Sequence, residues 1–134
     1  MLFRSALGGE VRGKTIAILG LTFKPNTDDM RDAPSLALIT ALQDAGAEIR
    51  AYDPQGMDAA ASMTSNVVFS DNAYACVENS DALVIVTEWD AFRALDLERV
   101  RSLLKTPVLI DLRNIYRPAE MRAKGFDYVS VGRP

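Results

Sequence analysis

The chain has 134 residues, with hydrophobic residues at 49% and charged residues at 25%, which suits one globular domain and excludes disorder, collagen and coiled coil. The net charge of −3 offers no basic face for nucleic acid, and no apolar stretch approaches the roughly 20 residues of a membrane span. Histidine is absent and Cys76 is the only cysteine, which excludes histidine-based catalysis, an internal disulfide and a cysteine-rich metal cluster. The start of the chain is too short and too quickly polar for a secretory signal, so we expect a cytoplasmic protein.

The first dozen residues differ from the rest of the chain. Leu2–Leu7 has the pattern of one short apolar helical turn, and Gly8-Gly9 ends that pattern. An apolar stub ahead of a complete domain indicates the tail of an element that belongs to something upstream. The stub therefore favours a piece of a longer protein over a natural short protein.

Six short apolar runs predict β-strands, and their near-continuous hydrophobic character suits strands covered on both faces of a parallel sheet. Between the first two, Pro34 precedes Leu36, Ile39 and Leu42 at helical spacing, and Gly46 ends the helix. Alternating strands and helices predict right-handed crossovers and a single α/β domain, with a doubly wound, mostly parallel six-stranded sheet of the Rossmann-like class. We expect strands at Thr15–Gly20, Glu48–Tyr52, Val67–Phe69, Ala82–Val86, Pro107–Asp111 and Phe126–Val131, and further helices at Met57–Met63, Asn72–Val77, Leu97–Leu104 and Pro118–Lys124.

The segment Gly20–Asp32 after the first strand is the first candidate site, because ligands of doubly wound sheets bind outside the carboxyl ends of the strands. It is too long for a G-x-G-x-x-G turn and lacks the G-K-[ST] of a P-loop, so no usual dinucleotide cradle is predicted. Lys24 and Arg31 are cations that can meet phosphate or carboxylate, next to the helix that begins near Pro34. Pairing of these two cations with the aspartates of the same loop is an equally good interpretation.

Four further residues follow predicted strands. Asp53-Pro54 comes where dinucleotide folds place a ribose-binding acid, but we interpret it as a turn. Trp89 is expected to pack under the next helix rather than to line a pocket, and Asp90 is expected to be an N-cap for the segment that follows it. Arg113 lies at the carboxyl end of a central strand, where a buried arginine requires an anionic partner, either a ligand phosphate or an aspartate.

The long segment Gly13–Ser35 closely resembles the opening of the C-terminal domain of bacterial UDP-glucose 6-dehydrogenases, in the UDP-glucose/GDP-mannose dehydrogenase family. Ala51–Pro54, Val86–Asp90 and Asp111–Asn114 resemble segments that appear in that family in the same order. The resemblance covers essentially all of the chain beyond the first dozen residues. The T-E-W-D segment favours the UDP-glucose branch over the GDP-mannose branch.

The resemblance implies that residues 1–12 are the end of a central linker helix and that residues 13–134 are the UDP-sugar-binding C-terminal domain. In such an enzyme an N-terminal Rossmann domain binds NAD, and the central helix carries the contact of a homodimer. A catalytic cysteine upstream supports two oxidations, from UDP-glucose to UDP-glucuronate, as in polysaccharide biosynthesis. Cys76 does not match the motif of that cysteine and is predicted to lie in the core. This chain alone is therefore expected to have no catalytic residue, and no metal site is expected.

The resemblance also implies site residues, which we assign to the positions of this sequence that match the motifs of the family. Phe23 and Lys24 resemble the pair that contacts the substrate, and Arg113 resembles the arginine of the D-x-R segment that contacts the nucleotide sugar. Arg31 resembles the arginine that reaches across the interdomain cleft to the NAD pyrophosphate. Three alternatives remain: a dehydrogenase of another nucleotide sugar (UDP-N-acetylhexosamine or GDP-mannose), a stand-alone nucleotide-binding module, and a structural or interaction domain.

Overall fold

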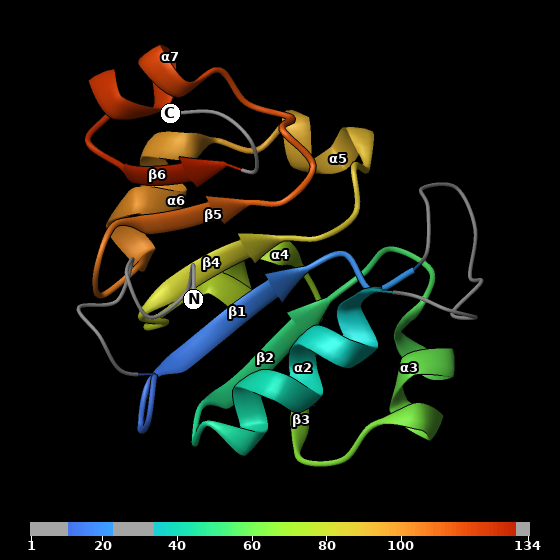
Figure 1. Cartoon of the computed structure of the whole chain (residues 1–134). Helices are drawn as coiled ribbons and strands as arrows, with labels where there is room; N and C mark the ends of the chain where they lie inside the picture. The colour runs from blue at the N-terminus through green and yellow to red at the C-terminus, as the bar shows by residue number, and fades with distance from the viewer. Residues whose placement is uncertain (1–10, 23–33, 131–134) are drawn as a thin grey trace.

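The computed structural model describes residues 11–22 and 34–130. Within these residues, six parallel strands form one sheet in the order β3-β2-β1-β4-β5-β6 (Figure 1). The predicted doubly wound α/β fold is confirmed. The strands are β1 (Thr15–Leu19), β2 (Glu48–Tyr52), β3 (Val67–Phe69), β4 (Ala82–Ile85), β5 (Val108–Asp111) and β6 (Asp127–Ser130). The helices are α2 (Pro34–Asp44), α3 (Met57–Met63), α4 (Ala73–Val77), α5 (Asp90–Arg93), α6 (Leu97–Leu103) and α7 (Pro118–Ala123).

The single-turn helix α5 has no counterpart among the predicted elements, because four residues are too few to show helical periodicity. Trp89 is the N-cap of α5 and makes no side-chain cap bond. The expectation that Asp90 is the N-cap of the segment after it is therefore wrong, because Trp89 takes that position. Asp90 lies inside the first turn, where its Oδ1 accepts a hydrogen bond from Nη1 of Arg93 at 3.2 Å.

The sheet separates two hydrophobic layers, because neighbouring side chains of a strand point to opposite faces. Ile16 and Ile18 of β1 belong to the layer that is covered by α2 and α3. Ala17 and Leu19 belong to the layer covered by α4, α5, α6 and α7. Burial on both faces explains the continuous apolar runs of the central strands. The helix residues fully or nearly fully buried against the sheet include Ile39, Leu42, Ala60, Cys76, Val77, Phe92, Val100 and Met121.

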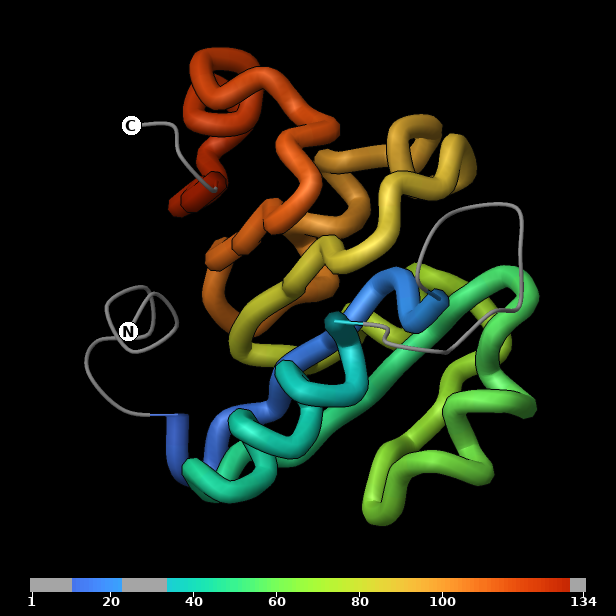
Figure 2. Tube along the Cα trace, turned by 45° about the vertical axis from the view of Figure 1, so that its right-hand side comes forward, coloured from blue at the N-terminus to red at the C-terminus, as the bar shows by residue number. Residues whose placement is uncertain are grey.

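At the amino edge of the sheet, the turns that lead into β1 and β2 lie side by side (Figure 2). The N–H of Gly13 donates to the carbonyl of Gly46 at 2.9 Å, and both glycines have positive φ. Val11 is buried in the same layer as Ile16. The domain boundary between residues 12 and 13 stays a prediction. None of the helices within residues 11–22 and 34–130 is long and apolar enough to cross a membrane.

Candidate functional site

Asp53, directly after β2, is a buried carboxylate that ties together the segments following three adjacent strands. Its Oδ2 accepts hydrogen bonds from the N–H groups of Leu21 at 2.7 Å and Thr22 at 3.2 Å, and from the Thr22 hydroxyl at 3.3 Å. The indole Nε1 of Trp89 donates to the same oxygen at 3.2 Å. One side chain thus holds the chain after β1, β2 and β4 at the carboxyl edge of the sheet.

The other carboxylate oxygen of Asp53 shapes its own turn. Oδ1 accepts from the N–H groups of Gln55 at 2.9 Å and Gly56 at 2.7 Å, so the turn interpretation of Asp53-Pro54 is confirmed. A Cβ on Gly56 would lie 2.5 Å from Cγ2 of Thr22, so the turn packs directly against the segment after β1. Because both oxygens are buried and bonded to donors of the protein, this carboxylate is not presented to a ribose.

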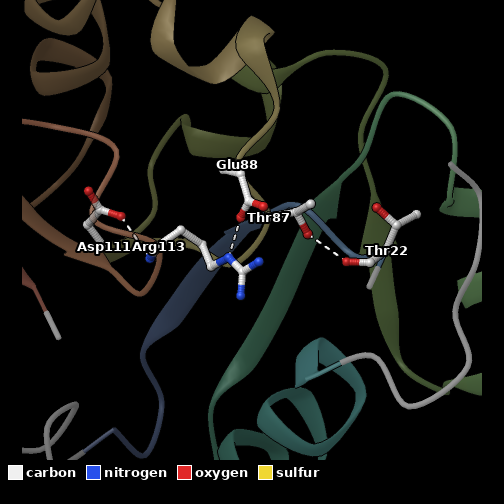
Figure 3. A network of polar contacts seen from close by, with 5 residues as sticks. All are labelled: Thr22, Thr87, Glu88, Asp111 and Arg113. Carbon is white, nitrogen blue, oxygen red and sulfur yellow. Dashed lines mark hydrogen bonds and ion pairs between the residues drawn. The ribbon is translucent and has the colours of Figure 1, made fainter. Parts of the chain in front are cut away.

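The segment that leaves β1 is also fixed by β4. Gly20 has a φ of +96°, and a Cβ there would lie 2.5 Å from the backbone nitrogen of Thr87. The buried Thr87 hydroxyl donates to the carbonyl of Thr22 at 2.7 Å (Figure 3). On the far side of residues 23–33, the Ser35 hydroxyl donates to the Leu21 carbonyl at 2.5 Å. Both described flanks of the predicted substrate loop are therefore anchored by buried hydrogen bonds.

Asp111, at the end of β5, is a second buried carboxylate with an organising role. Its Oδ1 accepts the N–H of Arg113 at 3.0 Å. Its Oδ2 accepts the N–H of Tyr116 at 3.1 Å and the hydroxyl of Tyr128 at 2.6 Å. Asn114 has a φ of +57°, which turns the chain away from the sheet edge. The D-x-R spacing therefore has a local physical reason: the aspartate fixes the backbone from which the arginine side chain extends.

The Arg113 side chain forms an ion pair with Glu88, which follows β4. Nε of Arg113 donates to Oε2 of Glu88, and the two side chains remain 35% and 29% exposed (Figure 3). This hydrogen bond lowers the pKa of Glu88 and raises the pKa of Arg113, against the opposing effect of desolvation, so both groups are charged at neutral pH. The expectation that Arg113 is buried is wrong, and the anionic partner in the structure is a glutamate.

The structure tests the predicted site residues unequally. Phe23, Lys24 and Arg31 lie in residues 23–33, outside the described residues, so their roles stay predictions. Arg113 is described and extends from the carboxyl edge of the sheet, where Figure 3 also shows Thr22. Its contact with a nucleotide sugar likewise stays a prediction.

Trp89 and Asp53 behave differently from ligand-facing residues. Trp89 is 6% exposed and belongs to the layer under α5, which confirms the prediction that it packs. Its hydrogen bond to Asp53 joins segments 36 residues apart and has no signal in the local sequence. The sequence offered one hint of the role of Asp53: a carboxylate directly after an apolar strand, followed by a turn whose backbone N–H groups need acceptors.

Cys76 is fully buried in the core, as predicted, and its Sγ lies 3.8 Å from the carbonyl oxygen of Ile18. Burial raises the pKa of the thiol to about 12, with a smaller opposing effect from Arg50. We expect iodoacetamide to modify the folded chain very slowly at pH 8, because both access and thiolate are lacking. The unfolded chain in urea should incorporate one label quickly. Rapid labelling of the native chain, followed by intact mass, would contradict this burial.

An all-parallel sheet of this strand order defines a Rossmann-like α/β domain, and its carboxyl edge is organised by two inward-turned aspartates. Residues 17–118 match the model of the UDP-glucose/GDP-mannose dehydrogenase family, UDP binding domain. The chain belongs to this family and corresponds to its UDP-binding domain.

Named relatives agree with this assignment. The chain is 55% identical over 130 residues to a UDP-glucose 6-dehydrogenase of Rhizobium meliloti, covering 97% of this chain and 30% of that protein. It is 46% identical over 127 residues to UDP-glucose 6-dehydrogenase TuaD of Bacillus subtilis, covering 94% of this chain and 28% of that protein. The chain thus spans about 30% of the length of the curated relatives it matches.

Solved structures show the same fold. An NDP-N-acetyl-D-galactosaminuronic acid dehydrogenase from Methanosarcina mazei superposes with a TM-score of 0.83 at 32% identity, covering 97% of this chain and 27% of that one. A UDP-D-ManNAc dehydrogenase from Pyrococcus horikoshii superposes with a TM-score of 0.79 at 30% identity, covering 98% of this chain and 29% of that one.

Proposed function

We propose that this chain is the nucleotide-sugar-binding part of an NAD-dependent UDP-glucose 6-dehydrogenase, an enzyme that oxidises UDP-glucose to UDP-glucuronate in two steps. The observation that carries the proposal is the position of Arg113: an exposed cation at the carboxyl edge of a domain of the UDP-binding family. A diphosphate is doubly anionic, and guanidinium groups bind phosphate oxygens in pairs. In this proposal the N-terminal half and NAD supply the chemistry, and this chain supplies no catalytic residue.

UDP-glucose is our first choice of substrate because the two curated relatives of 55% and 46% identity are both UDP-glucose 6-dehydrogenases. The two solved structures of 30% and 32% identity are, by name, dehydrogenases of N-acetylated nucleotide sugars. Such a sugar is therefore the second candidate. The higher identity of the UDP-glucose enzymes is what favours the first.

The proposed site divides its cations between two ligands. Phe23, Lys24 and Arg113 contact the nucleotide sugar, and Arg31 reaches the NAD pyrophosphate in the complete enzyme. Each desolvated, charge-assisted contact contributes about 1.5–3 kcal/mol. We further propose that the complete enzyme is a cytoplasmic homodimer that serves polysaccharide biosynthesis. With only one wall of the cleft, this chain should bind UDP weakly.

A groove at the opposite, amino edge of the sheet has a volume of about 880 Å³ and is lined by residues that include Asp44, Glu48 and Arg50. The guanidinium of Arg50 already donates to the carbonyls of Glu78 and Ala75, and two carboxylates stand beside it. We therefore prefer the carboxyl edge as the binding surface for a diphosphate.

Titration of UDP into the chain, followed by nuclear magnetic resonance, tests the proposal. Arg113→Ala should weaken UDP binding by about tenfold or more, since one charge-assisted contact is lost. Arg122→Ala, which removes an exposed arginine of α7, is the matched control and should leave the affinity unchanged. Equal affinity in Arg113→Ala would refute the site, and no binding of the wild-type chain at millimolar UDP would favour a structural domain.

A second experiment separates an enzyme part from a stand-alone binding module. The chain is mixed with the N-terminal half of a UDP-glucose 6-dehydrogenase, and NADH formation is followed by absorbance at millimolar UDP-glucose. Activity that depends on both halves supports the proposed function. UDP binding without any such activity, in a mixture shown to form a complex, would favour the stand-alone module.

A further inference from the structure

Glu88 binds Arg113 by one particular edge of the guanidinium. The contact uses Nε, and Figure 3 shows the two terminal nitrogens pointing away from Glu88. In the described part of the chain, Nη1 and Nη2 make no hydrogen bond. A guanidinium has five N–H donors in a rigid plane. When Glu88 occupies Nε, the pair Nη1 and Nη2 can still bind two oxygens of one anion.

Glu88 itself stands on a fixed backbone. The residue before it, Thr87, is fully buried and bonded to the Thr22 carbonyl. The residue after it, Trp89, is buried and bonded to the Asp53 carboxylate. Both neighbours are held in the interior while the Glu88 side chain remains partly exposed at the edge.

The backbone of Arg113 is fixed from the other side. Asp111, fully buried at the end of β5, accepts its N–H at 3.0 Å. Strands β4 and β5 are paired neighbours, with Ile85 opposite Asp111. Two rigid strand ends therefore bring a glutamate and an arginine together, and the long arginine side chain is oriented before any ligand arrives.

We propose that Glu88 is a positioning residue, which holds Nε of Arg113 so that Nη1 and Nη2 bind two oxygens of the UDP diphosphate. The inference rests on the proposed function. Glu88 also neutralises the charge of Arg113. Binding of the diphosphate therefore depends on the orientation of Nη1 and Nη2 more than on the net charge of the pair. A glutamate that merely competed with phosphate for Arg113 would have the opposite effect on affinity.

The test compares UDP affinities of Glu88→Ala and Glu88→Gln with that of the wild-type chain. Glu88→Ala should bind UDP about tenfold more weakly, the loss of roughly one oriented charge-assisted contact, and Glu88→Gln about threefold more weakly. Asp90→Asn is the matched control, since it removes an equal charge from an exposed carboxylate two residues away. This control should bind UDP as the wild type does. In an Arg113→Ala background, Glu88→Ala should have no further effect.

The chemical shift of the Arg113 Nε–H resonance gives a second readout. It would not change in Glu88 variants if Glu88 only supported the local structure. The resonance is assigned by its loss in Arg113→Ala, and it should shift in Glu88→Gln without ligand. If it does not shift, the pair does not form in solution and the inference is overturned. If Glu88→Ala binds UDP as tightly as the wild type, or more tightly, while Arg113→Ala binds weakly, Glu88 is a competitor and only the proposed function survives. If the wild-type chain does not bind UDP, both fail.

Discussion

Replacement of Asp53 with asparagine is expected to destabilise the domain by about 3–5 kcal/mol, because either orientation of the amide sets donor against donor. If the amide nitrogen replaces Oδ1, it faces the N–H groups of Gln55 and Gly56. If it replaces Oδ2, it faces the N–H groups of Leu21 and Thr22 and the indole of Trp89. Buried donors without partners cost about 1–3 kcal/mol each.

Chemical denaturation with urea, with Trp89 fluorescence as the signal, measures the effect of Asp53→Asn. In thermal unfolding followed by the same fluorescence, the melting temperature should fall by roughly 10 °C or more in a domain of this size. Asp58→Asn, at an exposed position of α3, is the control and should change stability by less than about 0.5 kcal/mol. A change for Asp53→Asn as small as that of the control would show that the carboxylate does not organise the three strand ends.

Gly20→Ala is expected to cost about 2–5 kcal/mol, for two separable reasons. A φ of +96° is strained for any residue with a Cβ, which accounts for about 1–2 kcal/mol. The new methyl group would also lie 2.5 Å from the Thr87 nitrogen and 2.6 Å from its Cβ. Overpacking of that kind adds about 1–3 kcal/mol and pushes the ends of β1 and β4 apart.

Gly13→Ala isolates the first of these reasons. Gly13 also has a positive φ, +75°, but a Cβ there would have nothing within 4 Å. This variant should lose only the backbone contribution of about 1–2 kcal/mol. The difference between the two variants, measured by urea denaturation, is the cost of the clash with Thr87. Equal losses would mean that β1 and β4 do not approach each other closely at this point.

The strands and most helices follow from the sequence, because their signals are local. The bounds of β2, β3 and α3 agree with prediction, and β1, β4 and β5 each differ by one residue at one end. Strand β6 begins one residue later than predicted, and its predicted end at Val131 lies outside the described residues. Apolar runs, a proline near a helix start and a glycine past its end are read within one segment. The exception is the single turn of α5, which was not predicted: Asp90 was expected to be the N-cap of the segment after it, and instead it lies inside this turn and pairs with Arg93.

The organisation of the carboxyl edge is not local, and the sequence could not predict it. Asp53 bonds to residues 31 to 36 positions away, on the loops of two other strands. Arg113 was expected to meet a phosphate or an aspartate, but its partner Glu88 lies 25 positions away, after the neighbouring strand β4. Such pairings depend on which strands become neighbours in the sheet. The roles of Phe23, Lys24 and Arg31 rest on family resemblance, since these residues lie outside the described part of the chain.

The single carboxylate shared by three strand ends also limits how this edge can be redesigned. Loops at the carboxyl edge of α/β scaffolds often carry binding residues, and loops generally tolerate insertions and deletions. Here a graft that lengthens the turn after β2 would displace Asp53, and with it the anchor of Leu21 and Trp89. Variant libraries designed to bind a new nucleotide sugar should therefore vary the loops after β1, β2 and β4 together, as one unit.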